Sequence, residues 1–148
     1  MILWRISRHS TLDGQGGLLA SARWHSRGRP IVYLAESPAG ALLEVLVHLE
    51  LTPDSLPSHY GLLKAEAPDE TPVLTLGPLD LSEDWVSDVI LTRSIGDEWL
   101  ASRSHVLLRV PSAIVPETFN VLLNPTHFDA GRVQVLWHQE YPWDVRLL

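Results

Sequence analysis

The stretch that decides the fold is residues 31–50, IVYLAESPAGALLEVLVHLE. Its first five residues are rich in β-branched and aromatic side chains, which predicts a strand over 31–35. Ser37 then stands where a helix N-cap is expected, and Pro38 stands at the first helical position. We therefore expect a helix that runs from Pro38 to about residue 50 and is ended by Thr52-Pro53.

The predicted helix carries apolar residues at helical spacing, and this stripe is expected to be buried. Its members are Ala39, Leu42, Leu43, Leu46 and Val47. Glu44 is a carboxylate among them, and Gly40 lies one turn earlier, where glycine costs about 1 kcal/mol relative to alanine. A carboxylate below a position without a side chain suggests the floor of a pocket. The alternative is that Glu44 and His48 simply form the polar face of an amphipathic helix.

Working outward from this stretch, the pattern predicts many short strands and one further helix. The further strands are expected over 2–6, 18–24, 59–66, 72–76, 105–110, 119–123 and 133–137. A turn over 26–30 precedes 31–35, a turn or short helix covers 81–85, and Thr92 is expected to cap a helix over 93–101. Strands and helices do not alternate as in βαβ units, so the fold class is α+β, in one domain over 1–148.

The composition is that of a folded globular protein: 45% of the 148 residues are hydrophobic and 20% are charged. Lysine and arginine number 11 against 18 acidic residues, and the net charge of −7 disfavours direct binding to nucleic acid. The absence of cysteine excludes disulfides and thiolate metal sites. No apolar run approaches the roughly 20 residues that cross a bilayer, and no signal peptide is evident. We expect a cytoplasmic protein without membrane contact.

Arg23 and Tyr33 fall in the strands predicted over 18–24 and 31–35. If these strands pair, the arginine could hold phosphates while the tyrosine stacks on a ring. The alternative is an exposed arginine and a core tyrosine, and the residues alone leave both open.

Further along the chain, single residues give weaker signals. Ser112 lies outside any Gly-x-Ser-x-Gly turn, which disfavours a serine nucleophile. His127 and Asp129 offer too few ligands for a metal ion. The simplest interpretation of Asn124-Pro125 is a turn. These signals predict an α+β domain with a polar pocket and no more.

The order of short motifs along the chain is more specific than any one of them. The first half contains Arg23-Trp24, Gly28-x-Pro30, Tyr33-Leu34-Ala35 and Ala41-Leu42-Leu43-Glu44-Val45-Leu46-Val47-His48. The second half contains Ile95-Gly96-Asp97-x-Trp99-Leu100, Val110-Pro111-Ser112-Ala113-x-Val115-Pro116, Asn120-x-Leu122-x-Asn124-Pro125-x-His127 and Trp143-Asp144-x-Arg146-Leu147. In this order they resemble the RES domain, a family named for Arg, Glu and Ser, over residues 1–148. The chain departs from the family at Ser21-Ala22, where the family has Gly-Gly, and at His25, where it has Asn.

The resemblance implies a fold similar to ADP-ribosyltransferases and diphtheria-type toxins, with short, mostly antiparallel strands around an NAD-binding cleft and flanking helices. By position, the implied catalytic residues are Glu44, Arg23 and Tyr33. Ser112 and Asn124 are implied to bind NAD together with Arg23 and Tyr33. No metal and no recycled cofactor are implied, because NAD is the substrate.

The implied function is that of the toxin in a toxin–antitoxin pair, which breaks the nicotinamide–ribose bond of NAD by hydrolysis or phosphorolysis. The alternatives are transfer of ADP-ribose to a protein, or a catalytically inactive module that only binds the antitoxin. The implied partner is a helix-turn-helix antitoxin whose C-terminal tail covers the active site, which would make the assembly a hetero-oligomer.

Overall fold

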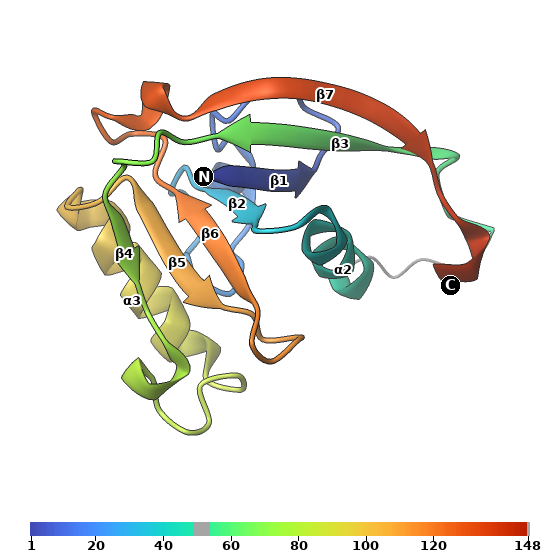
Figure 1. The fold of residues 1–148 in the computed structure, drawn as a ribbon. Coiled ribbons are helices and arrows are strands. Elements are labelled where there is room, and N and C mark those ends of the chain that lie inside the picture. The colour runs from blue at the N-terminus through green and yellow to red at the C-terminus, as the bar shows by residue number, and fades with distance from the viewer. Residues whose placement is uncertain (49–53, 148) are drawn as a thin grey trace.

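Seven strands of the described chain form one curved sheet, with two longer helices packed around it (Figure 1). The structure is a computed structural model that describes residues 1–48 and 54–147. The elements in order are β1 (Ile2–Ile6), α1 (Gly16–Leu19), β2 (Val32–Ala35), α2 (Pro38–His48), β3 (His59–Glu66), β4 (Val73–Thr75), η1 (Pro78–Asp80), α3 (Val89–Ser102), β5 (Leu107–Pro111), β6 (Phe119–Leu123), η2 (Ala130–Arg132), β7 (Gln134–Pro142) and η3 (Val145–Leu147).

The strand order is β4-β5-β6-β2-β1-β3-β7. Every pairing is antiparallel except β4 with β5, which is parallel. The predicted α+β class with mostly antiparallel strands is therefore confirmed. In Figure 1 the β4-β5-β6 half runs across the direction of the β1-β3-β7 half, which is the accumulated twist expected of a sheet this wide.

The central strands are apolar on both faces, because each face is covered. On β5, Leu107 joins one core cluster and Leu108 the other, and on β6 the same alternation separates Leu123 from Leu122. Side chains on a strand alternate between its two faces, so these two clusters lie on opposite sides of the sheet. The cluster of Leu108 and Leu122 also contains Trp99 of α3, which places that helix on one side.

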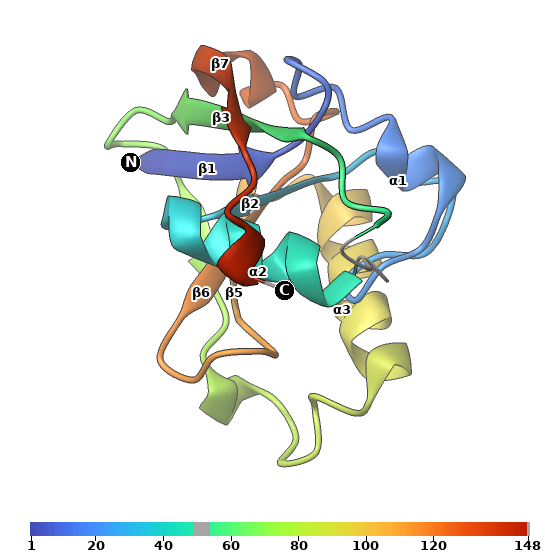
Figure 2. The same cartoon turned by 90° about the vertical axis from the view of Figure 1, so that its right-hand side faces the viewer.

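The other long helix, α2, contacts β1 and β2 and lies across the front in Figure 2. The predicted buried stripe of this helix is mostly wrong. Ala39 is exposed, Leu43 is 41% exposed and Val47 is 59% exposed, whereas Leu42 and Leu46 are only partly buried. The buried residue of the helix is instead Ala41, on the face that covers a cavity.

The strand predicted over 18–24 is also wrong. The chain forms the short helix α1 and then a turn at residues 23–24, closed by an isolated bridge between Ala22 and His25. Gly17 is pressed against the backbone of Arg29 and Ile31, so a side chain at this position would collide with it. Residues 18–24 therefore form a short helix and a turn, because the close contact of Gly17 with residues 29–31 outweighs their β-propensity.

The helix expected over 93–101 begins four residues earlier, at Val89. Its N-cap is Asp88, whose carboxylate accepts a hydrogen bond from the amide of Leu91 at 3.0 Å. Thr92, the predicted cap, is instead buried inside the helix, and its hydroxyl donates to the carbonyl of Arg23 at 2.6 Å.

Most other predicted elements are confirmed. The strands expected over 2–6, 59–66 and 119–123 have the observed bounds, and the turn expected within 81–85 is found at residues 83–87. The last long strand is extended, since β7 runs to Pro142 against β3. The predicted end of the first helix, from residue 49 to Thr52-Pro53, lies outside the described residues.

Candidate active site

The site forms where β1 and β2 stop pairing. These strands share the single register pair Trp4–Ala35. Continued antiparallel pairing would place Arg5 opposite Leu34 and Ile6 opposite Tyr33, and all four of these residues instead line a cavity of about 330 Å³. The divergence of two central strands therefore creates the hollow. Its remaining walls are α2, the turn at residues 22–24 and the ends of β5 and β6.

Glu44 of α2 lies in the wall of this cavity, with its side chain 30% exposed. Its Oε1 accepts a hydrogen bond from the Asn120 side-chain amide at 2.7 Å and another from the Ser112 hydroxyl at 3.3 Å. Its Oε2 lies 4.0 Å from Nε2 of His48, one turn later on the helix. One carboxylate oxygen is thus anchored on the β5–β6 side, which fixes the orientation of the group.

Tyr33 of β2 lines the same cavity. Its hydroxyl oxygen accepts a hydrogen bond from the Trp24 amide at 3.2 Å and lies 2.8 Å from Nδ1 of His25. Burial raises the pKa of Tyr33 well above its ordinary value, with a smaller opposing contribution from the Trp24 amide. The phenol is therefore neutral over the physiological range.

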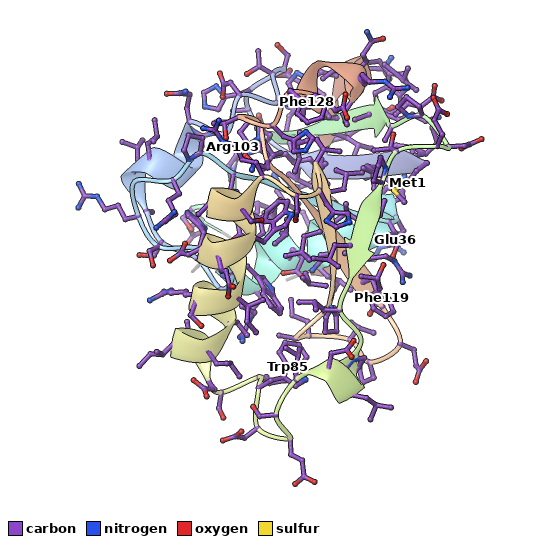
Figure 3. All side chains as sticks on the ribbon, turned by 90° about the vertical axis from the view of Figure 1, so that its left-hand side faces the viewer. Met1, Glu36, Trp85, Arg103, Phe119 and Phe128 are labelled. Carbon is purple, nitrogen blue, oxygen red and sulfur yellow. The ribbon has the colours of Figure 1, made fainter. Side chains whose placement is uncertain are left out.

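Arg23 reaches the cavity from the turn and not from a strand. Its guanidinium donates to the Val86 carbonyl at 2.7 Å and lies 6.0 Å from the centre of the Trp85 ring. Trp85 belongs to the loop before α3, at the opposite end of the molecule from Phe128 (Figure 3). Arg23 is therefore held from outside the cavity by this loop.

Helix α3 fixes the backbone of the turn that carries Arg23. Arg93 donates to the Ala22 carbonyl at 2.8 Å, and Thr92 donates to the Arg23 carbonyl. One turn later, Gly96 lies against the carbonyl of Trp24. Residues spaced by three and four lie on one face of a helix. This face of α3 therefore contacts the three successive carbonyl groups of residues 22–24.

Arg5 of β1 is a site residue that the sequence analysis missed. Its side chain lines the cavity, and the structure shows no hydrogen bond or ion pair for its guanidinium among the described residues. Burial lowers the pKa of Arg5, and the carboxylate of Asp13 only partly opposes this shift. A desolvated cation that forms no close ion pair is costly, and an anion bound in the cavity would offset this cost. The available signal was an arginine inside the apolar strand Ile2–Ile6.

Ser112 and Asn120 lie on the Glu44 side of the site. Besides donating to Glu44, the Ser112 oxygen accepts hydrogen bonds from the amides of Ile114 and Val115. Asn120 was noticed only as part of a motif, yet it makes the shorter contact to the carboxylate. Both residues therefore brace Glu44.

Asn124 is not brought to the cavity. It is 1% exposed, its amide donates to the Leu100 carbonyl, and its oxygen accepts from the amide and hydroxyl of Thr126. The side-chain oxygen therefore stabilises the turn at Asn124-Pro125, and the side-chain amide joins this turn to α3.

Over residues 1–48 and 54–147, no group of three or more histidine, aspartate or glutamate side chains is placed to hold a metal ion. No helix in these same ranges is long and apolar enough to cross a membrane.

Comparison with known proteins identifies the family. The model of the RES domain matches residues 2–144. A protein of Pseudomonas putida named Toxin Res is 47% identical over 99% of both chains. The Prs ADP-ribosylating toxin of a Sphingobium species is 36% identical, over 98% of this chain and 95% of its own.

The fold has a counterpart among solved structures. The chain matches one in the crystal structure of the M. tuberculosis MbcT-MbcA toxin–antitoxin complex with a TM-score of 0.76, at 18% identity, over 99% of this chain and 85% of that one. The family model and the two relatives cover nearly the whole sequence, cavity residues included. The chain therefore belongs to the RES-domain family.

Proposed function

We propose that this protein is a toxin that consumes NAD by breaking the bond between nicotinamide and ribose. The observation that carries the proposal is the cavity at the β1–β2 divergence, where one carboxylate, one phenol ring and two guanidinium groups line a single hollow. NAD combines a cationic ring, a ribose and a pyrophosphate, and these groups match the three kinds of side chain. NAD is proposed as the substrate and not as a recycled cofactor.

The chemistry needs stabilisation of positive charge on the sugar. When the bond between nicotinamide N1 and ribose C1′ breaks, its electron pair leaves with nicotinamide, which becomes neutral. The ribose then has oxocarbenium character, as in glycoside hydrolysis. A fixed carboxylate stabilises this cation, and a well-placed electrostatic group of this kind contributes about 3–4 kcal/mol. We assign this role to Glu44, because Asn120 and Ser112 hold its carboxylate in place.

The other cavity residues have binding roles in this proposal. Arg5, which lines the cavity and forms no close ion pair among the described side chains, binds the pyrophosphate. Arg23, which is anchored to the Val86 carbonyl, closes the nicotinamide end. The ring of Tyr33 lies against the nicotinamide. Ser112 acts by bracing Glu44, and the contacts of Asn124 support no substrate contact for it.

We propose water or inorganic phosphate as the acceptor of the ADP-ribosyl group. With water, the products are nicotinamide, ADP-ribose and a proton. With phosphate, the second product is ADP-ribose carrying a phosphate on C1′. Incubation of the purified chain with NAD, with and without phosphate, followed by mass spectrometry identifies the acceptor. Intact NAD in both incubations would reject hydrolysis and phosphorolysis, and would leave transfer to a protein or a binding module.

A second candidate is ADP-ribosyl transfer to a protein, favoured by the relative named Prs ADP-ribosylating toxin. The same cavity serves this reaction, since only the attacking nucleophile differs. Incubating the chain with NAD and purified Prs protein tests it directly. An added ADP-ribose mass on Prs supports transfer, and unmodified Prs beside released ADP-ribose supports hydrolysis.

We also propose an antitoxin partner, because the matched structure is that of a toxin–antitoxin complex. The expected partner is a helix-turn-helix protein whose C-terminal tail covers the cavity. Expression of the chain alone should arrest growth and lower cellular NAD. Co-expression with the product of the adjacent gene should suppress both effects, and Glu44→Gln should abolish them without the partner.

A further inference from the structure

His25 is buried directly behind Tyr33, although it does not line the cavity. Only 2% of the residue is exposed, and both nitrogens of its ring lie within hydrogen-bond distance of a partner. The two rings are 5.6 Å apart, tilted by 52°. A buried imidazole with two fixed partners is an unusually well-defined group, and the chemistry proposed above does not use it.

The partners of the ring determine where its proton lies. Nε2 is 2.8 Å from the carbonyl oxygen of Ala20, and a carbonyl only accepts hydrogen bonds. Nε2 must therefore carry the proton. In the neutral ring Nδ1 then has a free lone pair, and it faces the Tyr33 hydroxyl at 2.8 Å.

The hydrogen-bonding pattern of Tyr33 follows from this tautomer. Its oxygen already accepts from the Trp24 amide, so the hydroxyl proton is donated to Nδ1 of His25. The proton points away from the cavity, although the ring of Tyr33 lines the cavity wall.

We infer that His25 is a positioning residue: by accepting the hydroxyl proton of Tyr33, it fixes the phenol so that only the ring meets the substrate. The inference rests on the proposed function, because the ring that Tyr33 would meet is nicotinamide. It assigns Tyr33 a contact role and removes its hydroxyl from acid–base catalysis. The departure from the family pattern at residue 25 then has a physical reason, since the imidazole reaches both Ala20 and Tyr33.

Protonation of His25 would reverse this arrangement. Nδ1 would then donate to the Tyr33 oxygen, and the hydroxyl proton would have to turn toward the cavity. The charged groups that act on the Tyr33 hydroxyl are Arg93 and Asp97 of α3 and Arg23 of the turn. Because burial keeps the phenol neutral, its hydroxyl retains the proton that this hydrogen bond requires.

NMR of the full chain with labelled histidine nitrogens reads the tautomer without any substrate, and the His25→Asn protein identifies the His25 signals. We expect a proton on Nε2 and none on Nδ1 at neutral pH, with the Nδ1 signal shifting in Tyr33→Phe. A proton on Nδ1, or an Nδ1 signal that does not change in Tyr33→Phe, overturns the inference. This result does not depend on whether the protein consumes NAD.

Kinetics then test the positioning role. His25→Ala should raise the KM for NAD about fivefold with little change in kcat, because a loosened ring weakens binding. His25→Asn should stay within about twofold of wild type, since its amide oxygen can accept the same proton. Tyr33→Phe removes the same hydrogen bond and should raise the KM by a similar factor, and adding His25→Ala to it should cost less than about twofold more.

A purely structural role for His25 predicts a different result. The cost of His25→Ala would then be the same with Tyr33 and with Phe at position 33, and additive costs would reject the inference. Complete lack of NAD consumption by wild type would reject the proposed function, and the NMR result would still decide the His25 contact.

Discussion

Gly96 of α3 lies directly against the backbone carbonyl of Trp24, the residue that follows Arg23 in the turn. A methyl group added at residue 96 would overlap this carbonyl oxygen, and backbone cannot yield as a flexible side chain does. Helix α3 and the turn at residues 22–24 can therefore lie this close only because glycine has no side chain.

Gly96→Ala should destabilise the fold by about 2–4 kcal/mol, because either the helix or the turn must move. NAD consumption should fall further than the loss of folded protein explains, since Arg23 moves with the turn. Urea unfolding and nicotinamide release measure the two effects. Gly131→Ala is the matched control, because nothing lies within 4 Å of a Cβ at that position. Equal stability of Gly96→Ala and Gly131→Ala would contradict the close packing of α3 against the turn.

Glu44→Gln should lower kcat by about 10²–10³-fold, the usual effect of removing one electrostatic group from a transition state. The folded state should change little, because the amide oxygen of glutamine can still accept from Asn120. Glu98→Gln, a change at an exposed glutamate of α3, controls for the loss of one charge. A Glu44→Gln protein with wild-type kcat would remove this residue from the mechanism.

Arg5→Met should raise the KM for NAD about tenfold and also raise the Tm of the free protein. The first effect follows from losing a charge-assisted phosphate contact, and the second from removing a desolvated cation whose burial Asp13 only partly offsets. Pyrophosphate should increase the Tm of wild type and not of Arg5→Met, by linkage of binding to folding. Arg27→Met, in an exposed turn, is the control. Unchanged KM in Arg5→Met would argue against the phosphate role.

Alkaline pH should destabilise the protein through Tyr33. Burial raises the folded-state pKa of Tyr33 above its unfolded value of about 10. The stability that this contributes is fully present below about pH 10 and is lost as the pH rises toward the folded pKa. In urea unfolding between about pH 8 and pH 11, Tyr33→Phe should lose stability less steeply than wild type. Tyr141→Phe, at an exposed position, should follow wild type.

The sequence predicted the regular parts of this fold and several cavity residues. The strands His59–Glu66 and Phe119–Leu123 were predicted with their observed bounds. The segment 18–24 was misassigned because its conformation depends on α3 and Ile31, which are distant in the sequence. Local propensity does not contain such contacts.

The inner face of α2 was misjudged for a related reason. Periodicity assumes that the most apolar face is buried, yet this helix turns Glu44 and His48 toward the cavity and leaves Val47 exposed. Arg5 and Asn120 could not be placed without knowing that β1 and β6 approach α2. Family resemblance supplied the cavity residues Arg23, Tyr33 and Glu44. It also suggested Ser112, which contacts Glu44 without lining the cavity, and Asn124, which the fold keeps away from it.

The single residue pair between β1 and β2 has a mechanical consequence. The β4-β5-β6-β2 and β1-β3-β7 portions of the sheet are joined at one narrow seam, and the cavity occupies the rest of that seam. A molecule bound there would touch Arg5 on one portion and Tyr33 on the other, replacing the missing ladder as a crosslink. A bound substrate would therefore stiffen the sheet where its two portions share only one register pair. The bound substrate would then stabilise the fold at the same place where the fold binds it.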